Sequence, residues 1–68
     1  MTFYEWLAKQ INRDDPIGDL AVDAMQDIDC PETNSEYKKW NSYLHSQQAS
    51  PDAIDALKEA FTEYNESH

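Results

Sequence analysis

The side chains best suited to bind a metal ion in this sequence are one cysteine and two histidines, Cys30, His45 and His68. Zinc sites take such ligands from closely spaced pairs, and these three residues stand far apart in the chain. We therefore predict no zinc site and no cofactor. Because a free cysteine behaves as a small apolar residue, we expect Cys30 to be buried or half-buried.

A calcium loop is suggested by Asp27-Ile28-Asp29, which places two carboxylates at the spacing of the first two ligands. The rest of the pattern fails. Proline stands at the third ligand position (Pro31), glutamate at the position of the turn glycine (Glu32), and lysine at the position of the last ligand (Lys38). We reject calcium binding of this type.

Nucleophilic catalysis requires a nucleophile, a base and an orienting group around a pocket. The serines occupy cap and loop positions, and His45 lies where the end of a predicted helix favours a positive side chain. A single glycine, Gly18, cannot form a glycine-rich phosphate loop. We predict that the protein is not an enzyme and has no catalytic residues.

The metal-binding and catalytic patterns considered above do not account for the many acidic residues. Fourteen acids and five bases give a formal net charge of −9, and eight of the acids lie between Arg13 and Lys38 with no base among them. Within one predicted helix, aspartate recurs every four residues, although like charges at this spacing cost about 0.2–0.5 kcal/mol per pair. The last helix repeats the pattern. The candidate partner-binding residues are Asp15, Asp19, Asp23, Asp27, Asp55, Glu59 and Glu63.

Two interpretations of these acids remain open: a solvated polar face, which every amphipathic helix needs, or a docking surface. The negative charge disfavours nucleic acid, whose phosphates require lysine and arginine, and also disfavours an anionic membrane. It favours a protein with a basic surface. Our hypothesis is a non-catalytic protein-interaction or regulatory domain. The alternative is an acidic mimic of nucleic acid that blocks a DNA-binding protein. Self-association is possible but is not predicted from these residues.

Helix signals occur four times and no strand pattern competes with them. We expect helices over residues 3–12, 16–28, 35–46 and 51–65, with a frayed tail at 65–68. The predicted starts are a capping box at Thr2, the Asp15-Pro16 and Ser50-Pro51 pairs, and a cap within residues 33–35. Ile11 and Ile28 extend the apolar stripes of the first two helices. Short connections between them predict compact helical hairpins.

One domain over residues 1–68 is expected at this length. A lone cysteine allows no internal disulfide, so aromatic side chains must supply much of the core. We assign Trp6, Trp40 and Phe61 to the core, and Tyr4 and Tyr43 to exposed positions just beside the apolar faces. The lone thiol and the absence of a signal peptide or membrane span favour the cytoplasm.

The order of several motifs resembles the YozE family of short bacterial proteins, mainly from Firmicutes. They are Phe3-Tyr4-x-Trp6-Leu7, Leu20-Ala21-x-x-Ala24, Asp27-x-x-x-Pro31, Tyr37 with Tyr43-Leu44, and Glu59-Ala60-Phe61-x-x-Tyr64. The resemblance implies a sterile-alpha-motif-like (SAM-like) fold of two helical hairpins packed crosswise. It implies no catalytic residues, and nucleic-acid binding by analogy with other SAM-like folds is the third and weakest hypothesis. Cys30 departs from the family, which usually has an aromatic residue before the proline.

Overall fold

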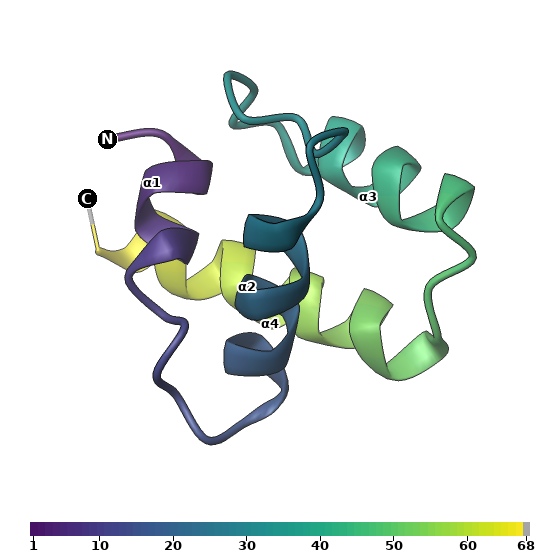
Figure 1. Cartoon of the computed structure of the whole chain (residues 1–68). Helices are drawn as coiled ribbons and strands as arrows, with labels where there is room; N and C mark the ends of the chain where they lie inside the picture. Colours follow the sequence, from purple (N-terminus) through teal and green to yellow (C-terminus); the bar gives the residue numbers. More distant parts are fainter. Residues whose placement is uncertain (68) are drawn as a thin grey trace.

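The computed structural model describes residues 1–67, and this part of the chain forms four α-helices and no strand. The helices are α1 (Phe3–Ala8), α2 (Pro16–Gln26), α3 (Tyr37–Ser46) and α4 (Pro51–Glu66). In Figure 1, α1 and α2 form one antiparallel hairpin, α3 and α4 form a second, and α2 crosses α4. The predicted all-α fold of two crossed hairpins is confirmed. No helix within residues 1–67 is both long and apolar enough to cross a bilayer.

Three of the four predicted helix starts are confirmed. At α1, the Thr2 hydroxyl accepts the Glu5 N–H at 3.1 Å, and the Glu5 carboxylate accepts the Thr2 N–H at 3.0 Å. Asp15 and Ser50 each accept the backbone N–H three residues later, at 3.0 and 3.3 Å, and each is followed by proline at the first helical position. These devices satisfy donors that the first helical turn leaves unpaired.

The predicted cap within residues 33–35 is wrong, because α3 begins two residues later than expected. Its N-cap is Glu36, which makes no side-chain cap hydrogen bond. The Ser35 hydroxyl instead accepts the backbone N–H of Phe3, at 3.1 Å, in the first turn of α1. A residue suited to cap its own helix therefore serves a helix 32 positions away in the sequence.

The first helix ends at Ala8, four residues before the predicted end at 12. The carbonyl of Trp6 accepts the Lys9 N–H at 3.1 Å and the Gln10 side-chain amide at 3.0 Å. These contacts satisfy helix-terminal acceptors, and the chain continues as turns. Ile11 is 43% exposed, so its predicted place on the apolar face is wrong.

The second helix also ends early, at Gln26 rather than at residue 28. Asp27 adopts an extended conformation, and its carboxylate accepts the N–H of Asp29 at 2.9 Å. Such a local side-chain bond competes with helix continuation. Ile28 is consequently 94% exposed, and its predicted membership of the buried stripe is wrong.

The last helix extends to Glu66, with Ser67 as its C-cap. The helix therefore ends one residue beyond the predicted end at 65. The hydroxyl of Ser67 donates to the carbonyl of Tyr64 at 2.9 Å, which stabilises this end. His68, which was included in the predicted frayed tail, lies outside the described residues.

Aromatic side chains from α1, α3 and α4 form the centre of the core. Phe3 is fully buried and stacks on Phe61 with 3.8 Å between ring centroids. Trp6, Trp40 and Phe61 are buried, as predicted, and so is Cys30. The indole N–H of Trp40 donates to a backbone carbonyl at 2.7 Å, so this buried donor is satisfied.

The connection between α1 and α2 packs directly on the first turn of α2 at Gly18. A methyl group at this position would overlap the carbonyl oxygen of Arg13 and lie 2.8 Å from its carbonyl carbon. Only glycine lets the two backbones approach so closely. This contact sets the path of the connection and the position of the Arg13 side chain.

Candidate interaction surface

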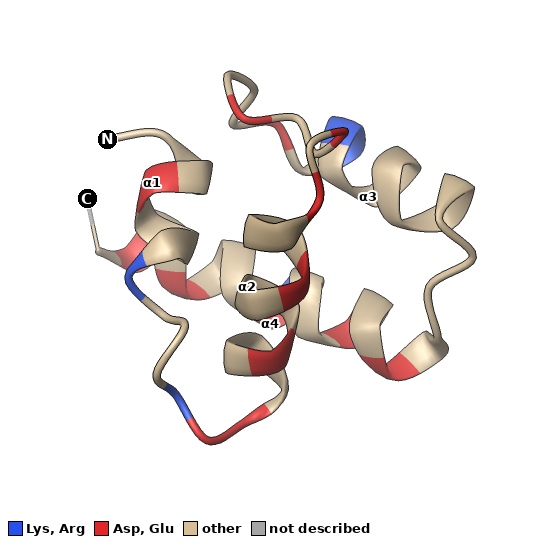
Figure 2. Ribbon diagram, viewed as in Figure 1, with Lys and Arg blue, Asp and Glu red and all other residues tan. Residues whose placement is uncertain are grey.

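Acidic residues lie on α2, in the connections on both sides of it and along α4, as Figure 2 shows. Asp19 and Asp23 are exposed on α2, and neither makes an ion pair or a side-chain hydrogen bond in the described structure. They follow one another at a four-residue spacing, where equal charges repel. These two carboxylates are uncompensated members of the predicted acidic face, as Asp55 and Glu59 are on α4.

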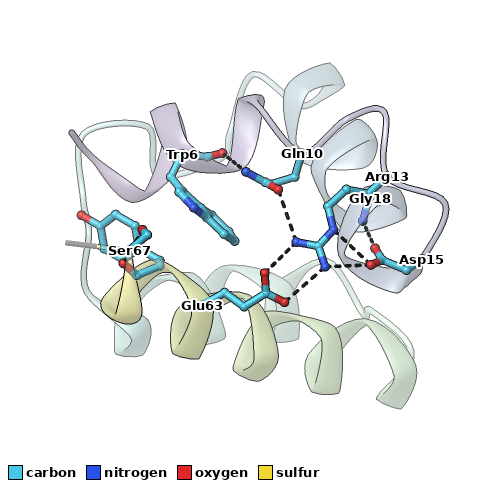
Figure 3. Close-up of polar contacts among 8 residues, drawn as sticks. Trp6, Gln10, Arg13, Asp15, Gly18, Glu63 and Ser67 are labelled. Carbon is cyan, nitrogen blue, oxygen red and sulfur yellow. Dashed lines mark hydrogen bonds and ion pairs between the residues drawn. The ribbon is translucent and has the colours of Figure 1, made fainter.

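Asp15 and Glu63, by contrast, are engaged with Arg13, as Figure 3 shows. The guanidinium donates to Asp15 at 2.8 and 3.0 Å and to Glu63 at 2.8 and 3.2 Å. The pKa of Asp15 is lowered first by the Gly18 N–H bond and then by Arg13. This cluster joins the α1–α2 connection to α4, and it leaves Asp15 and Glu63 with a structural role.

The carboxylate of Asp27 is also engaged in a side-chain hydrogen bond. It accepts the hydroxyl of Tyr43 at 2.6 Å, which ties the end of α2 to α3. This bond is the main reason why the pKa of Asp27 is lowered. The pKa of Tyr43 is raised, first by burial and then by the bond to Asp27.

We expect the replacement of Tyr43 by phenylalanine to destabilise the fold within a limited pH window. The lowered pKa of Asp27 means that its contribution is present above the ordinary value of 3.8 and is lost as the pH falls through the folded-state pKa. The raised pKa of Tyr43 means that its contribution is present below the ordinary value of 10.0 and is lost as the pH rises through the folded-state pKa. Urea unfolding at a series of pH values measures the difference between the two proteins.

The expected difference is largest between these limits and shrinks on both sides. The variant keeps the edge-to-face contact of the Tyr43 ring with Trp40, at 5.8 Å, so it removes the hydroxyl alone. A difference that does not vary with pH would contradict this interpretation.

Tyr4 and Tyr43 are half-buried and pack against the core, so their predicted exposure is wrong. For Tyr43, the reason is the contact of its ring with Trp40 and of its hydroxyl with Asp27. A position just beside the apolar face of a helix therefore does not mean that the ring lies in solvent.

Two adjoining hollows lie between α2 and the segment where α3 passes into α4, with volumes of about 170 and 260 Å³. Both are lined by Leu20, Asp23, Ser50 and Ala53, so they form one continuous depression, which we call the α2–α4 groove. The remaining lining residues are Pro16, Asp19, Asp27, Tyr43, Leu44, Gln47, Ala49 and Asp52. No lysine or arginine of the described chain lines either hollow.

The groove brings together Asp19, Asp23 and Asp27 from the predicted set and adds Asp52, which the sequence analysis missed. In the sequence, Asp52 is recognisable only as an acidic residue in the first turn after Ser50-Pro51. The packing of α4 against α2 is what brings it near Asp23. Asp55 and Glu59 are exposed on α4 and do not line the groove.

Other chemistry has little support within residues 1–67. No group of three potential metal ligands is close enough to hold an ion. Cys30 is buried, and burial is the main reason why the pKa of its thiol is raised. A protonated, enclosed thiol is a poor nucleophile.

Comparison with known proteins bears on the family. The searches of curated proteins and of solved structures give no match. The family described as the YozE SAM-like fold matches residues 2–66. That match covers nearly the whole chain and agrees with the crossed helical hairpins and with the order of motifs in the sequence. The chain therefore belongs to the YozE SAM-like family.

Proposed function

We propose that this protein is a small, non-catalytic protein-interaction domain that presents the exposed aspartates of α2 to a basic partner in the cytoplasm. The observation that carries the proposal is the pair Asp19 and Asp23, which are exposed at a four-residue spacing without a basic neighbour in contact. Their mutual repulsion lowers the stability of α2, and a cationic partner would relieve it.

The other predicted acids contribute less to this proposal. Asp15 and Glu63 already bind Arg13, and Asp27 already binds Tyr43. Substituting them would disturb the fold together with any contact surface. Asp19 and Asp23 can be changed without breaking a hydrogen bond in residues 1–67, so they give the cleaner test.

Affinity capture from a cell lysate, followed by binding measurements with the purified partner, tests the proposal. We expect Asp19→Lys/Asp23→Lys to weaken binding by at least about tenfold, since it replaces two attractive contacts by two repulsive ones. The matched control is Asp55→Lys/Glu59→Lys, which makes the same change of net charge on α4 outside the groove. Circular dichroism verifies that both variants remain folded.

Equal binding by wild type and the Asp19→Lys/Asp23→Lys variant would rule out this surface. Equal loss in both reversal variants would show that net charge, rather than the α2 surface, controls binding. A captured DNA-binding protein that releases its DNA when this chain is added would instead support the nucleic-acid mimic, which was the alternative from the sequence.

A further inference from the structure

The α2–α4 groove combines an apolar floor with an acidic rim. Leu20 and Leu44 line it although each is at most 5% exposed, so they form its floor, together with the half-buried Ala53. The exposed carboxylates of Asp19 and Asp23 stand along the α2 side. A patch of this kind suits a ligand that is apolar in the middle and cationic at its edges.

Each hollow of the groove can receive an apolar side chain. The two volumes are about 170 and 260 Å³, and each hollow by itself is smaller than the roughly 300–1,000 Å³ of ordinary ligand pockets. They share four lining residues, so they are neighbouring parts of one trough. Such a trough can receive one or two apolar side chains from a longer partner segment.

The side of the groove that α3 lines carries no lysine, arginine or carboxylate. Tyr43, Leu44 and Gln47 line it from the end of α3, and α3 contains no lysine, arginine, aspartate or glutamate after Lys39 (Figure 2). The carboxylates therefore lie on α2 and, through Asp52, at the start of α4. A cationic segment would meet favourable charge along α2 and no repelling base on the α3 side.

We propose that the α2–α4 groove binds an amphipathic helix of a partner protein, in which an apolar side chain is flanked by lysine or arginine at a four-residue spacing. The inference rests on the proposed function and specifies the partner segment. Asp19 and Asp23 are one four-residue step apart on α2, about 6 Å along the helix axis, and basic residues four apart on a partner helix advance by the same amount. A partner helix lying along α2 thus matches both the charges and the floor.

Other modes of peptide recognition fit the groove less well. Strand addition needs a sheet edge, and residues 1–67 contain no strand. Proline-rich segments need a groove lined with several aromatic side chains, whereas Tyr43 is the one aromatic residue lining these hollows. Acidic or phosphorylated segments need arginine clusters, and the lining residues include none. A helix laid in an apolar groove remains.

The probe for the test is a synthetic helix of about 15 residues, with a leucine stripe flanked by lysines at four-residue intervals. Fluorescence anisotropy measures its affinity for the wild-type chain and for two groove variants. Asp19→Asn/Asp23→Asn should raise Kd by about threefold to tenfold and reduce its dependence on salt, because two exposed ion pairs are lost. Ala53→Leu should raise Kd by about tenfold with the salt dependence unchanged, because it fills the apolar hollow.

Matched controls distinguish binding in the groove from nonspecific electrostatic attraction and nonspecific hydrophobic binding. Asp55→Asn/Glu59→Gln removes two charges away from the groove and should change Kd by less than about twofold at physiological salt. A probe with serine in place of every leucine should bind more than about tenfold more weakly to wild type. In nuclear magnetic resonance spectra of wild type, the probe should shift the methyl signals of Leu20 and Leu44.

The possible failures are distinguishable. If the aspartate variant loses affinity while Ala53→Leu and the serine probe bind as well as their parents, the apolar groove is wrong and the acidic surface stands. If neither aspartate substitution nor increased salt changes the affinity, both the groove and the proposed function are wrong. If the probe shifts other methyl signals of the wild-type protein but not those of Leu20 and Leu44, the groove is also overturned. This outcome does not depend on how any variant folds.

Discussion

Replacing Phe3 with alanine is expected to lower the free energy of unfolding by about 3–5 kcal/mol, the cost of truncating a buried phenylalanine. Phe3 is fully buried and stacks on Phe61 at 3.8 Å, with Trp40 edge-on at 5.0 Å. At about 0.05–0.15 kcal/mol per residue, a domain of this size has roughly 3–10 kcal/mol in total. The variant should therefore be largely unfolded or have a much lower urea midpoint. Tryptophan fluorescence reports the transition.

Two further variants make the result interpretable. Phe3→Leu keeps an apolar side chain of similar size and should cost less than Phe3→Ala. Val22→Ala changes a partly exposed residue of α2 and should alter stability by no more than about 0.5 kcal/mol. If Phe3→Ala were as stable as Val22→Ala, the aromatic cluster would not be the main source of stability.

Gly18→Ala is expected to lower the free energy of unfolding by about 1–3 kcal/mol, which is the range for forcing an extra methyl group into a packed site. Helix propensity alone predicts the opposite sign, since alanine is favoured over glycine by about 1 kcal/mol within a helix. The overlap with the carbonyl of Arg13 decides between them, because backbone cannot swing aside as a flexible side chain can. Urea unfolding measures the sign.

The Arg13 side chain provides an internal check on this explanation. Its bonds to Asp15 and Glu63 hold the connection in place, so the connection cannot retreat from a new methyl group without losing them. Gly18→Ala should therefore cost less when Arg13 is already alanine. An exposed helical substitution, Ser42→Ala, serves as the control with little expected effect. A Gly18→Ala variant more stable than wild type would refute the close approach.

Helix starts were predictable because their signals are local. Thr2, Asp15 and Ser50 each act on a backbone N–H three residues away, so a short stretch of sequence contains both partners. The exception has a physical reason. Ser35 carries the right side chain for a cap, but the backbone N–H that it accepts belongs to Phe3, on another helix.

Helix ends were less predictable because competing bonds decide them. The apolar pattern continues through Ile11 and Ile28, yet both residues are exposed. Side-chain bonds of Gln10 to Trp6 and of Asp27 to the next turn satisfy backbone groups that a longer helix would have used. Periodicity reports which residues are apolar, and it does not report where the backbone finds other partners.

For the candidate surface, too, some properties follow from the sequence and others only from the tertiary structure. The sequence alone determined that the protein is acidic and all-α, that four helices make it up, and that aspartates recur along α2, because composition and spacing are properties of the chain itself. Tertiary structure decided which acids are free: Arg13 takes Asp15 and Glu63, and Tyr43 takes Asp27. It also created the groove, since Leu20 and Ala53 come from different helices that meet only where α2 crosses α4.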